Sequence, residues 1–173
     1  MGLSASIGGG IVIFTIIYVV MTFPSLIEAT SSITNTYSLK SDLENSILKS
    51  NIKIVSVIGA SLSNLLDVDL DNTGNEKLWD YNRFTVIVSY DGGILSKIKY
   101  GEQLSYDKNC SGTTGTWCIS QFLYDLQDPK ILNPNERLHI KAYLAHPIYP
   151  NGLVTTSIST DNGVTSTHSD VIS

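Results

Sequence analysis

The sequence predicts an all-β sandwich of about 7–8 strands, immunoglobulin-like in architecture, preceded by one N-terminal transmembrane α-helix and a helical stalk. Three observations predict it: an uncharged apolar start, a Ser/Thr-rich segment with near-helical spacing of its apolar residues, and a period of two from Asn51 onward. They divide the chain into a transmembrane helix (1–27), a helical stalk or linker (28–50) and a β-sandwich domain (51–173).

The first segment has the length and composition of a membrane anchor. No charged residue occurs from Met1 to Ile27, and ten of the seventeen residues from Ile7 to Phe23 are Ile, Val or Phe. As a helix it would extend about 37 Å, enough to cross a hydrocarbon core of about 30 Å. The alternative is a cleaved secretory signal, which normally has a positive n-region, a shorter apolar run and a small-residue cleavage site. The first segment lacks positive charge, and its small residues come late, so a retained anchor is favoured.

The next segment connects this anchor to the sandwich. Ile33, Tyr37, Leu43 and Ile47 recur at near-helical spacing, although the many Ser and Thr residues have poor helix propensity. Pro24 either kinks the helix or marks the start of a second segment. We interpret 28–50 as a stalk whose apolar stripe packs either on the domain or on a second copy of the chain.

Short runs rich in β-branched and aromatic residues follow from Asn51 to the end. The runs are IKIVSVI, LLDVDL, FTVIVSY, LSKIKY, WCISQF, RLHIKAYLA and LVTTSIST, and turn-forming segments such as DNTGN, YDGG and TDNG separate them. In LLDVDL the residues Leu66, Val68 and Leu70 fall on one side while Asp67, Asp69 and the following Asp71 fall on the other. This alternation is typical of a sheet with one face in the core and one in water.

Charge and motif content exclude several classes of function. All the charge, a net −5, lies after Ile27, and no Lys/Arg cluster offers a nucleic-acid surface. There is no G-x-S-x-G motif and no phosphate-binding glycine loop outside the apolar start. His139, His146 and His168 do not have the spacing of zinc ligands. We therefore expect neither an enzyme nor a cofactor.

One segment, DLDNTGNEKLWD, partly fits a calcium-binding loop. It places Asp69, Asp71, Thr73 and Asp80 at the first, third, fifth and twelfth positions of an EF-hand-like loop. The last ligand should be a bidentate Glu, however, and such a loop should follow a helix rather than leave a strand. A turn between strands is therefore favoured over a metal site.

The two cysteines stand close together in NCSGTTGTWC. Cys110 and Cys118 flank a Gly/Thr-rich loop, so a disulfide is expected, with two buried free thiols as the alternative. A disulfide requires an oxidising compartment. Asn109 is the acceptor of an N-C-S sequence, which makes it a candidate N-glycosylation site. Both features favour a domain outside the cell, on a single-pass protein of the cytoplasmic membrane.

The whole chain resembles one known family. The start MGLSASIGGGIVIF, then LDVDLDNTGNEKLWDYNRFTVIVSYDGG, then LNPNERLHI and STDNGV, resemble the archaellar (archaeal flagellar) FlaF proteins. The resemblance implies an archaellum stator or anchor that binds the surface-layer (S-layer) protein from the extracellular or pseudoperiplasmic space. It also implies a homodimer or heteromer, with a FlaG-like partner and the motor complex as further contacts.

Two other functions are compatible with this architecture. Filament-forming subunits, namely FlaG-like proteins, archaellins and adhesive pilins, share the anchor and the sandwich. They are generally made with a basic leader, which we do not expect for this chain because its start is free of positive charge. A membrane-tethered module that binds a sugar or a metal belongs to another class. Binding of calcium or a glycan by the purified protein would favour that module.

Overall fold

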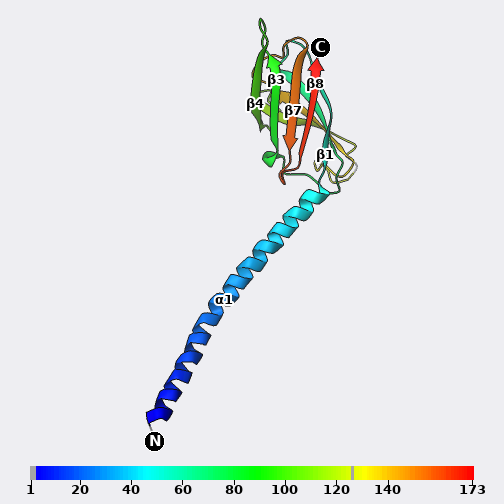
Figure 1. The fold of residues 1–173 in the computed structure, drawn as a ribbon. Helices are drawn as coiled ribbons and strands as arrows, with labels where there is room; N and C mark the ends of the chain where they lie inside the picture. The colour runs from blue at the N-terminus through cyan, green and yellow to red at the C-terminus, as the bar shows by residue number, and fades with distance from the viewer. Residues whose placement is uncertain (1–2, 126) are drawn as a thin grey trace. The chain divides into compact units, whose positions relative to one another are not determined.

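The computed structural model describes residues 3–125 and 127–173; within the helix it describes side chains from residue 9, except at 23, 25–27, 29–30, 32 and 35. The chain forms two compact units, of which the first ends at Glu44 and the second comprises Asn45–Ser173. One helix, α1 (Leu3–Lys49), precedes all the strands (Figure 1).

Helix α1 is continuous, and Pro24 lies inside it rather than at its end. Its last turn contains Lys49, whose charge complements the partial negative charge of a helix C-terminus. Among the residues that the structure describes, no helix combines the length and the apolar character that crossing a membrane requires. The transmembrane helix predicted over 1–27 is therefore not supported by the structure.

Eight strands are described in the second unit, within the predicted range of about 7–8; seven of them match the apolar runs of the sequence, and β8 lies outside those runs. They are β1 (Ile52–Gly59), β2 (Leu65–Asn72), β3 (Thr85–Gly92), β4 (Ile98–Tyr106), β5 (Thr116–Leu123), β6 (Arg137–Tyr143), β7 (Gly152–Ser159) and β8 (Thr165–Ile172), with a short 3₁₀ helix, η1 (Tyr81–Arg83), before β3. Burial alternates along most of them, for example in β6, where every second residue is buried. This period of two gives each strand one core face.

The strands follow the order β1-β2-β6-β5-β4-β3-β7-β8. Pairing is antiparallel within β1-β2-β6-β5 and within β4-β3-β7-β8. The two halves join through a parallel pairing of β4 with β5, which pairs Ser105 with Thr116 and Tyr106 with Trp117. At the other side β8 approaches β1 (Figure 1). There the Ile54 N–H donates to Ser166 Oγ at 3.0 Å. The result is an immunoglobulin-like sandwich that is nearly closed into a barrel.

One apolar core fills the space between the two halves. Its largest fully buried side chains are Trp117, Tyr90, Leu66, Leu70, Leu132, Leu138, Ile140, Leu144, Ile148 and Ile158. Because β2 contributes Leu66, Val68 and Leu70 to this core, its aspartates lie on the opposite face, as the alternation predicts. Trp117 is fully buried.

The turn after β2 holds the end of α1 against the sandwich within the second unit. The N–H groups of Thr73 and Gly74 donate to Asn51 O, both at 2.9 Å, and the Asn75 N–H donates to Lys49 O at 2.7 Å. The buried Asn72 side chain stabilises the same turn, since its Oδ1 accepts from the Gly74 N–H at 3.0 Å. The sequence DNTGN is therefore a turn, and it also fixes the start of β1.

Candidate interaction surfaces

The carboxylates of the calcium-loop candidate are engaged with protein partners. Asp69 Oδ1 lies 2.7 Å from His139 Nδ1, and Asp69 Oδ2 accepts from Ser56 Oγ at 3.0 Å. Asp71 forms an ion pair with Arg137, whose Nη2 donates to Asp71 Oδ2 at 2.9 Å. These contacts bind β2 to its neighbours β1 and β6 across the exposed face.

The other two members of the candidate lie beyond β2. Thr73 is in the turn that contacts Asn51, and Asp80 precedes η1, with its Oδ2 3.9 Å from Arg83 Nη1. In residues 3–125 and 127–173, no three His, Cys, Asp or Glu side chains are grouped so that they could hold a metal ion. The structure therefore assigns these residues to a turn and to cross-strand ion pairs.

We expect calcium to leave the thermal stability of the protein unchanged. A ligand that binds only the folded state must raise the melting temperature, and the carboxylates of Asp69 and Asp71 are already engaged by His139 and Arg137. Thermal melts with millimolar calcium and with a chelator should coincide. An upward shift with calcium that the Asp69→Asn variant abolishes would contradict this assignment.

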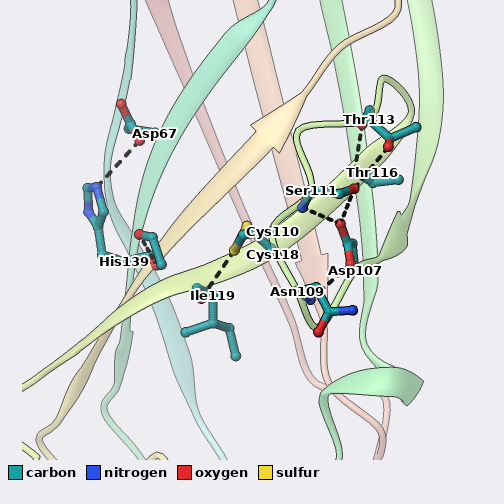
Figure 2. Close-up of a disulfide and its surroundings, with 11 residues drawn as sticks. Asp67, Asp107, Asn109, Cys110, Ser111, Thr113, Thr116, Cys118, Ile119 and His139 are labelled. Carbon is teal, nitrogen blue, oxygen red and sulfur yellow. Dashed lines mark hydrogen bonds and ion pairs between the residues drawn. A yellow bond between two sulfur atoms is a disulfide. The ribbon is translucent and has the colours of Figure 1, made fainter.

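The disulfide connects the loop between β4 and β5 to strand β5, and the glycosylation candidate lies in the same loop. Cys110 and Cys118 are bonded, with their Cα atoms 5.3 Å apart (Figure 2). Asp107 organises the loop, because its carboxylate accepts from the Asn109 N–H at 2.9 Å and from the Ser111 N–H and hydroxyl at 2.6 Å each (Figure 2). The bonds from Ser111 and Asn109 hold the pKa of Asp107 below its usual value. Asn109 itself is exposed.

We predict that Cys110 and Cys118 form this disulfide in protein taken directly from cells. Alkylation without a reductant should leave the intact mass unchanged, because no thiol would be available. Reduction should then lower the free energy of unfolding by about 2.5 kcal/mol, the chain-entropy value for so small a ring. Two alkylated cysteines in unreduced protein would contradict the prediction.

A pocket that the sequence analysis did not identify lies beside β5. Its volume is about 340 Å³, and it is lined by Trp79, Tyr81, Asn82, Tyr106, Lys108, Ile119, Phe122 and Lys130. It exists because β4 and β5 pair at two positions only, so the rest of the β5 edge is not covered by β4. The segment around η1 and the loops on either side of β5 form the remaining wall.

Hydrogen bonds fix the buried side of this pocket. The Tyr81 hydroxyl donates to Leu78 O at 2.9 Å and accepts from the Leu132 N–H at 3.0 Å. Burial raises the pKa of Tyr81, so this phenol stays protonated and keeps its donor role. The Tyr81 ring centroid lies 6.0 Å from that of Phe122 and 6.5 Å from that of Tyr106.

The edge of β4 offers a second surface. Residues Ile98–Leu104 pair with β3 on one side, and on the other side no ladder partner is present in the described part of the chain. The adjoining β3–β4 turn exposes two large apolar side chains, Ile94 (69% exposed) and Leu95 (95% exposed). An unpaired strand edge next to apolar side chains can accept a strand from another protein.

Comparisons with known proteins agree with this fold. The stator protein complex of FlaF and FlaG from Sulfolobus acidocaldarius contains a chain that is 22% identical, with a TM-score of 0.53 over 69% of this chain and 87% of that one. The archaeal flagellum of Methanospirillum hungatei strain JF1 matches with 14% identity and a TM-score of 0.62 over 100% of this chain and 94% of that one. Archaeal flagellin FlaB1 from Methanocaldococcus jannaschii is 12% identical, with a TM-score of 0.52 over 71% of this chain and 90% of that one. These likenesses show a shared fold.

A match between the sequence and a family model shows the family of this chain. No curated protein sequence matches the chain. The model of the conserved flagellar protein F immunoglobulin-like domain matches residues 48–168, which include every strand from β1 to β7 and the first part of β8. The chain therefore belongs to the FlaF family of archaellar proteins.

Proposed function

We propose that this protein is a stator-type component of the archaellum that holds the motility motor to the cell envelope by binding the S-layer protein. The observation that carries the proposal is the family match over residues 48–168. The structural relative from Sulfolobus acidocaldarius is described as a periplasmic stator protein complex. By analogy, we place the sandwich outside the cytoplasmic membrane, in the extracellular or pseudoperiplasmic space.

The architecture suits a protein that anchors a partner rather than one that converts a substrate. A stator must resist force, and the sandwich has one continuous core and a nearly closed ring of strands. We propose that its partner binds the unpaired edge of β4 and the apolar side chains Ile94, Leu95 and Ile98 beside it. A FlaG-like protein or a second copy of the chain is a further candidate for this edge, in line with the expected homodimer or heteromer.

Attachment to the membrane through α1 remains part of the proposal. The large apolar side chains from Ile11 to Met21 are all at least 46% exposed in the isolated chain. The hydroxyls of Thr15 and Thr22 donate to the carbonyls of Ile11 and Tyr18, so both are satisfied within the helix. Such a surface is favourable in lipid or against other helices. Recovery of the protein in the membrane fraction after carbonate extraction would support attachment, and recovery in the supernatant would oppose it.

Binding to the S-layer protein tests the function directly. Full-length protein in detergent should be retained by isolated S-layer sheets, and Leu95→Asp or Ile98→Lys should reduce retention. Val171→Lys is the matched control, because Val171 is an exposed apolar residue on β8, away from the β4 edge. Equal retention of all three variants would remove the β4 edge from the proposal, and no retention of the unmodified protein would contradict S-layer binding.

A filament subunit is the second candidate, and one observation favours it. The archaeal flagellum of Methanospirillum hungatei matches the entire chain, including α1, at a TM-score of 0.62. A stator should remain with the cell envelope when filaments are sheared off, whereas a subunit should appear in the sheared filaments in stoichiometric amount. A deletion strain should keep its cell layer but lose swimming if the stator proposal holds.

A further inference from the structure

We propose that the pocket beside β5 binds an acidic sugar, a pyranose that bears a carboxylate. The volume of about 340 Å³ falls at the lower end of the roughly 300–1,000 Å³ that is usual for small-molecule sites. The inference depends on the residues that line the pocket and not on the stator role, so the two can fail separately.

Aromatic rings provide the apolar part of the site. Trp79 lines the pocket with 61% of its surface exposed, whereas the other tryptophan, Trp117, is fully buried. The half-buried rings of Tyr106 and Phe122 belong to the same lining. The C–H groups of a pyranose form a flat apolar face, and such a face stacks favourably on aromatic rings. Exposed Trp79 is therefore a platform for a sugar ring.

Polar groups in the same lining suit the hydroxyls of a sugar. The Asn82 side chain has both an acceptor oxygen and a donor nitrogen, and the Tyr106 hydroxyl can donate or accept. Each sugar hydroxyl likewise needs a donor and an acceptor when it leaves water. A purely apolar ligand would leave these protein groups without partners, which is costly.

The charge of the lining selects an anion. Lys108 and Lys130 line the pocket, and none of the lining residues is acidic, although the chain as a whole has a net charge of −5. Neither ammonium group takes part in an ion pair within the described residues, and both side chains are exposed. An ammonium forms a charge-assisted hydrogen bond with a carboxylate, which is stronger than a neutral one.

Three carboxylates lie on the adjacent segments, and each has a partner of its own. Asp107 accepts the hydrogen bonds from Ser111 and Asn109, Asp128 lies 2.5 Å from Lys77 Nζ, and Asp125 Oδ2 accepts from the Lys130 backbone N–H at 3.4 Å. These partners reduce the competition of the three carboxylates for the ammonium groups of Lys108 and Lys130. A ligand carboxylate can therefore use both lysines.

The site is also preorganised. Tyr81 is held by its two hydrogen bonds, and Ile119 follows Cys118 of the disulfide directly in β5. Little ordering is then required when a ligand binds, and this lowers the free-energy cost of association. Reduction of the disulfide should weaken binding at this pocket without touching any group that contacts the sugar.

Saturation-transfer NMR with two matched sugars tests the proposal. The probes are methyl glucuronide and methyl glucoside, which share the ring and differ in the carboxylate. Full-length protein should be used in a zwitterionic detergent that has no sugar headgroup. We expect the glucuronide to bind about tenfold more tightly than the glucoside, the ratio expected for one charge-assisted contact.

Variants separate the two parts of the site. Trp79→Ala should abolish binding of both sugars, and the double variant Lys108→Gln/Lys130→Gln should bind them equally weakly. Lys99→Gln is the matched control, because Lys99 is exposed on β4 and does not line the pocket. Unchanged circular dichroism and melting temperature would show that the variants are folded.

Three outcomes would overturn the inference. They are no saturable signal from either sugar, a signal that Trp79→Ala leaves unchanged, and equal binding of the two sugars by the unmodified protein. In a further experiment, a short oligoglutamate peptide competes with the glucuronide for the pocket. If the peptide binds at Trp79 and the glucuronide does not, the pocket recognises acidic peptides instead, and the sugar proposal fails.

Discussion

The substitution Gly74→Ala is expected to destabilise the sandwich by at least about 3 kcal/mol, because overpacking against backbone cannot be relieved by a rotamer change. A Cβ on Gly74 would lie 2.3 Å from Asn51 N and 2.6 Å from Lys49 O. Moving these atoms would break the hydrogen bonds from Thr73, Gly74 and Asn75 that hold residues 49–51. Urea unfolding followed by circular dichroism measures the loss.

Gly101→Ala is the control for this prediction. Gly101 lies in β4, and a Cβ there would meet no atom within 4 Å. The free energy of unfolding of the Gly101→Ala variant should stay within about 0.5 kcal/mol of that of the unmodified protein, as for most surface substitutions. Similar stabilities for the two alanine variants would mean that the backbone of residues 49–51 can move to accommodate a Cβ at residue 74 without loss of stability.

Trp117→Ala should cost about 3–5 kcal/mol, the usual range for removing a large aromatic side chain from a core. Trp117 is fully buried, and its ring centroid lies 4.7 Å from that of Tyr106. Its indole nitrogen has no hydrogen-bond partner among the described residues, so the cost comes from the cavity and from lost contacts. Equilibrium unfolding in urea gives the value.

Two related variants test the mechanism of this loss. Trp117→Phe should be much less destabilising, because it keeps an aromatic ring and removes the unpaired N–H. Trp79→Ala should change stability by less than about 1 kcal/mol, since Trp79 is 61% exposed. Equal losses for Trp117→Ala and Trp79→Ala would contradict the burial that the structure describes.

Local patterns predicted the strands well because each strand has one core face and one wet face. The alternation in LLDVDL predicted which side of β2 is buried, and the apolar runs correspond to seven of the strands; β8 is more polar and was not among the runs. The prediction of a transmembrane helix depended on the length and composition of the first segment. Helix α1 is continuous in the structure. In the described part of the chain, however, no helix meets the requirements for a membrane span.

The candidate sites could not be predicted because they depend on contacts between distant residues. Asp71 and Arg137 pair across 66 positions, and Asp69 and His139 across 70, so the calcium-loop pattern alone did not reveal these partners. The pocket depends on the parallel pairing of β4 with β5, which no local pattern encodes. Trp79 in KLWDYN was visible in the sequence, but its neighbours Phe122 and Lys130 come from a later part of the chain.

The strand order also determines how the domain can fold. Four antiparallel pairs, β1–β2, β3–β4, β5–β6 and β7–β8, connect strands that follow one another in the chain, so they can form as hairpins with low loop-closure entropy. The other contacts between neighbouring strands join segments that are distant in the sequence, and the contact of Ile54 with Ser166 spans 112 positions. We therefore expect fast formation of local hairpins and slower docking between them, with refolding times of about milliseconds to seconds in stopped-flow experiments. Until β8 docks beside β1, unpaired strand edges would be exposed, and such edges favour aggregation.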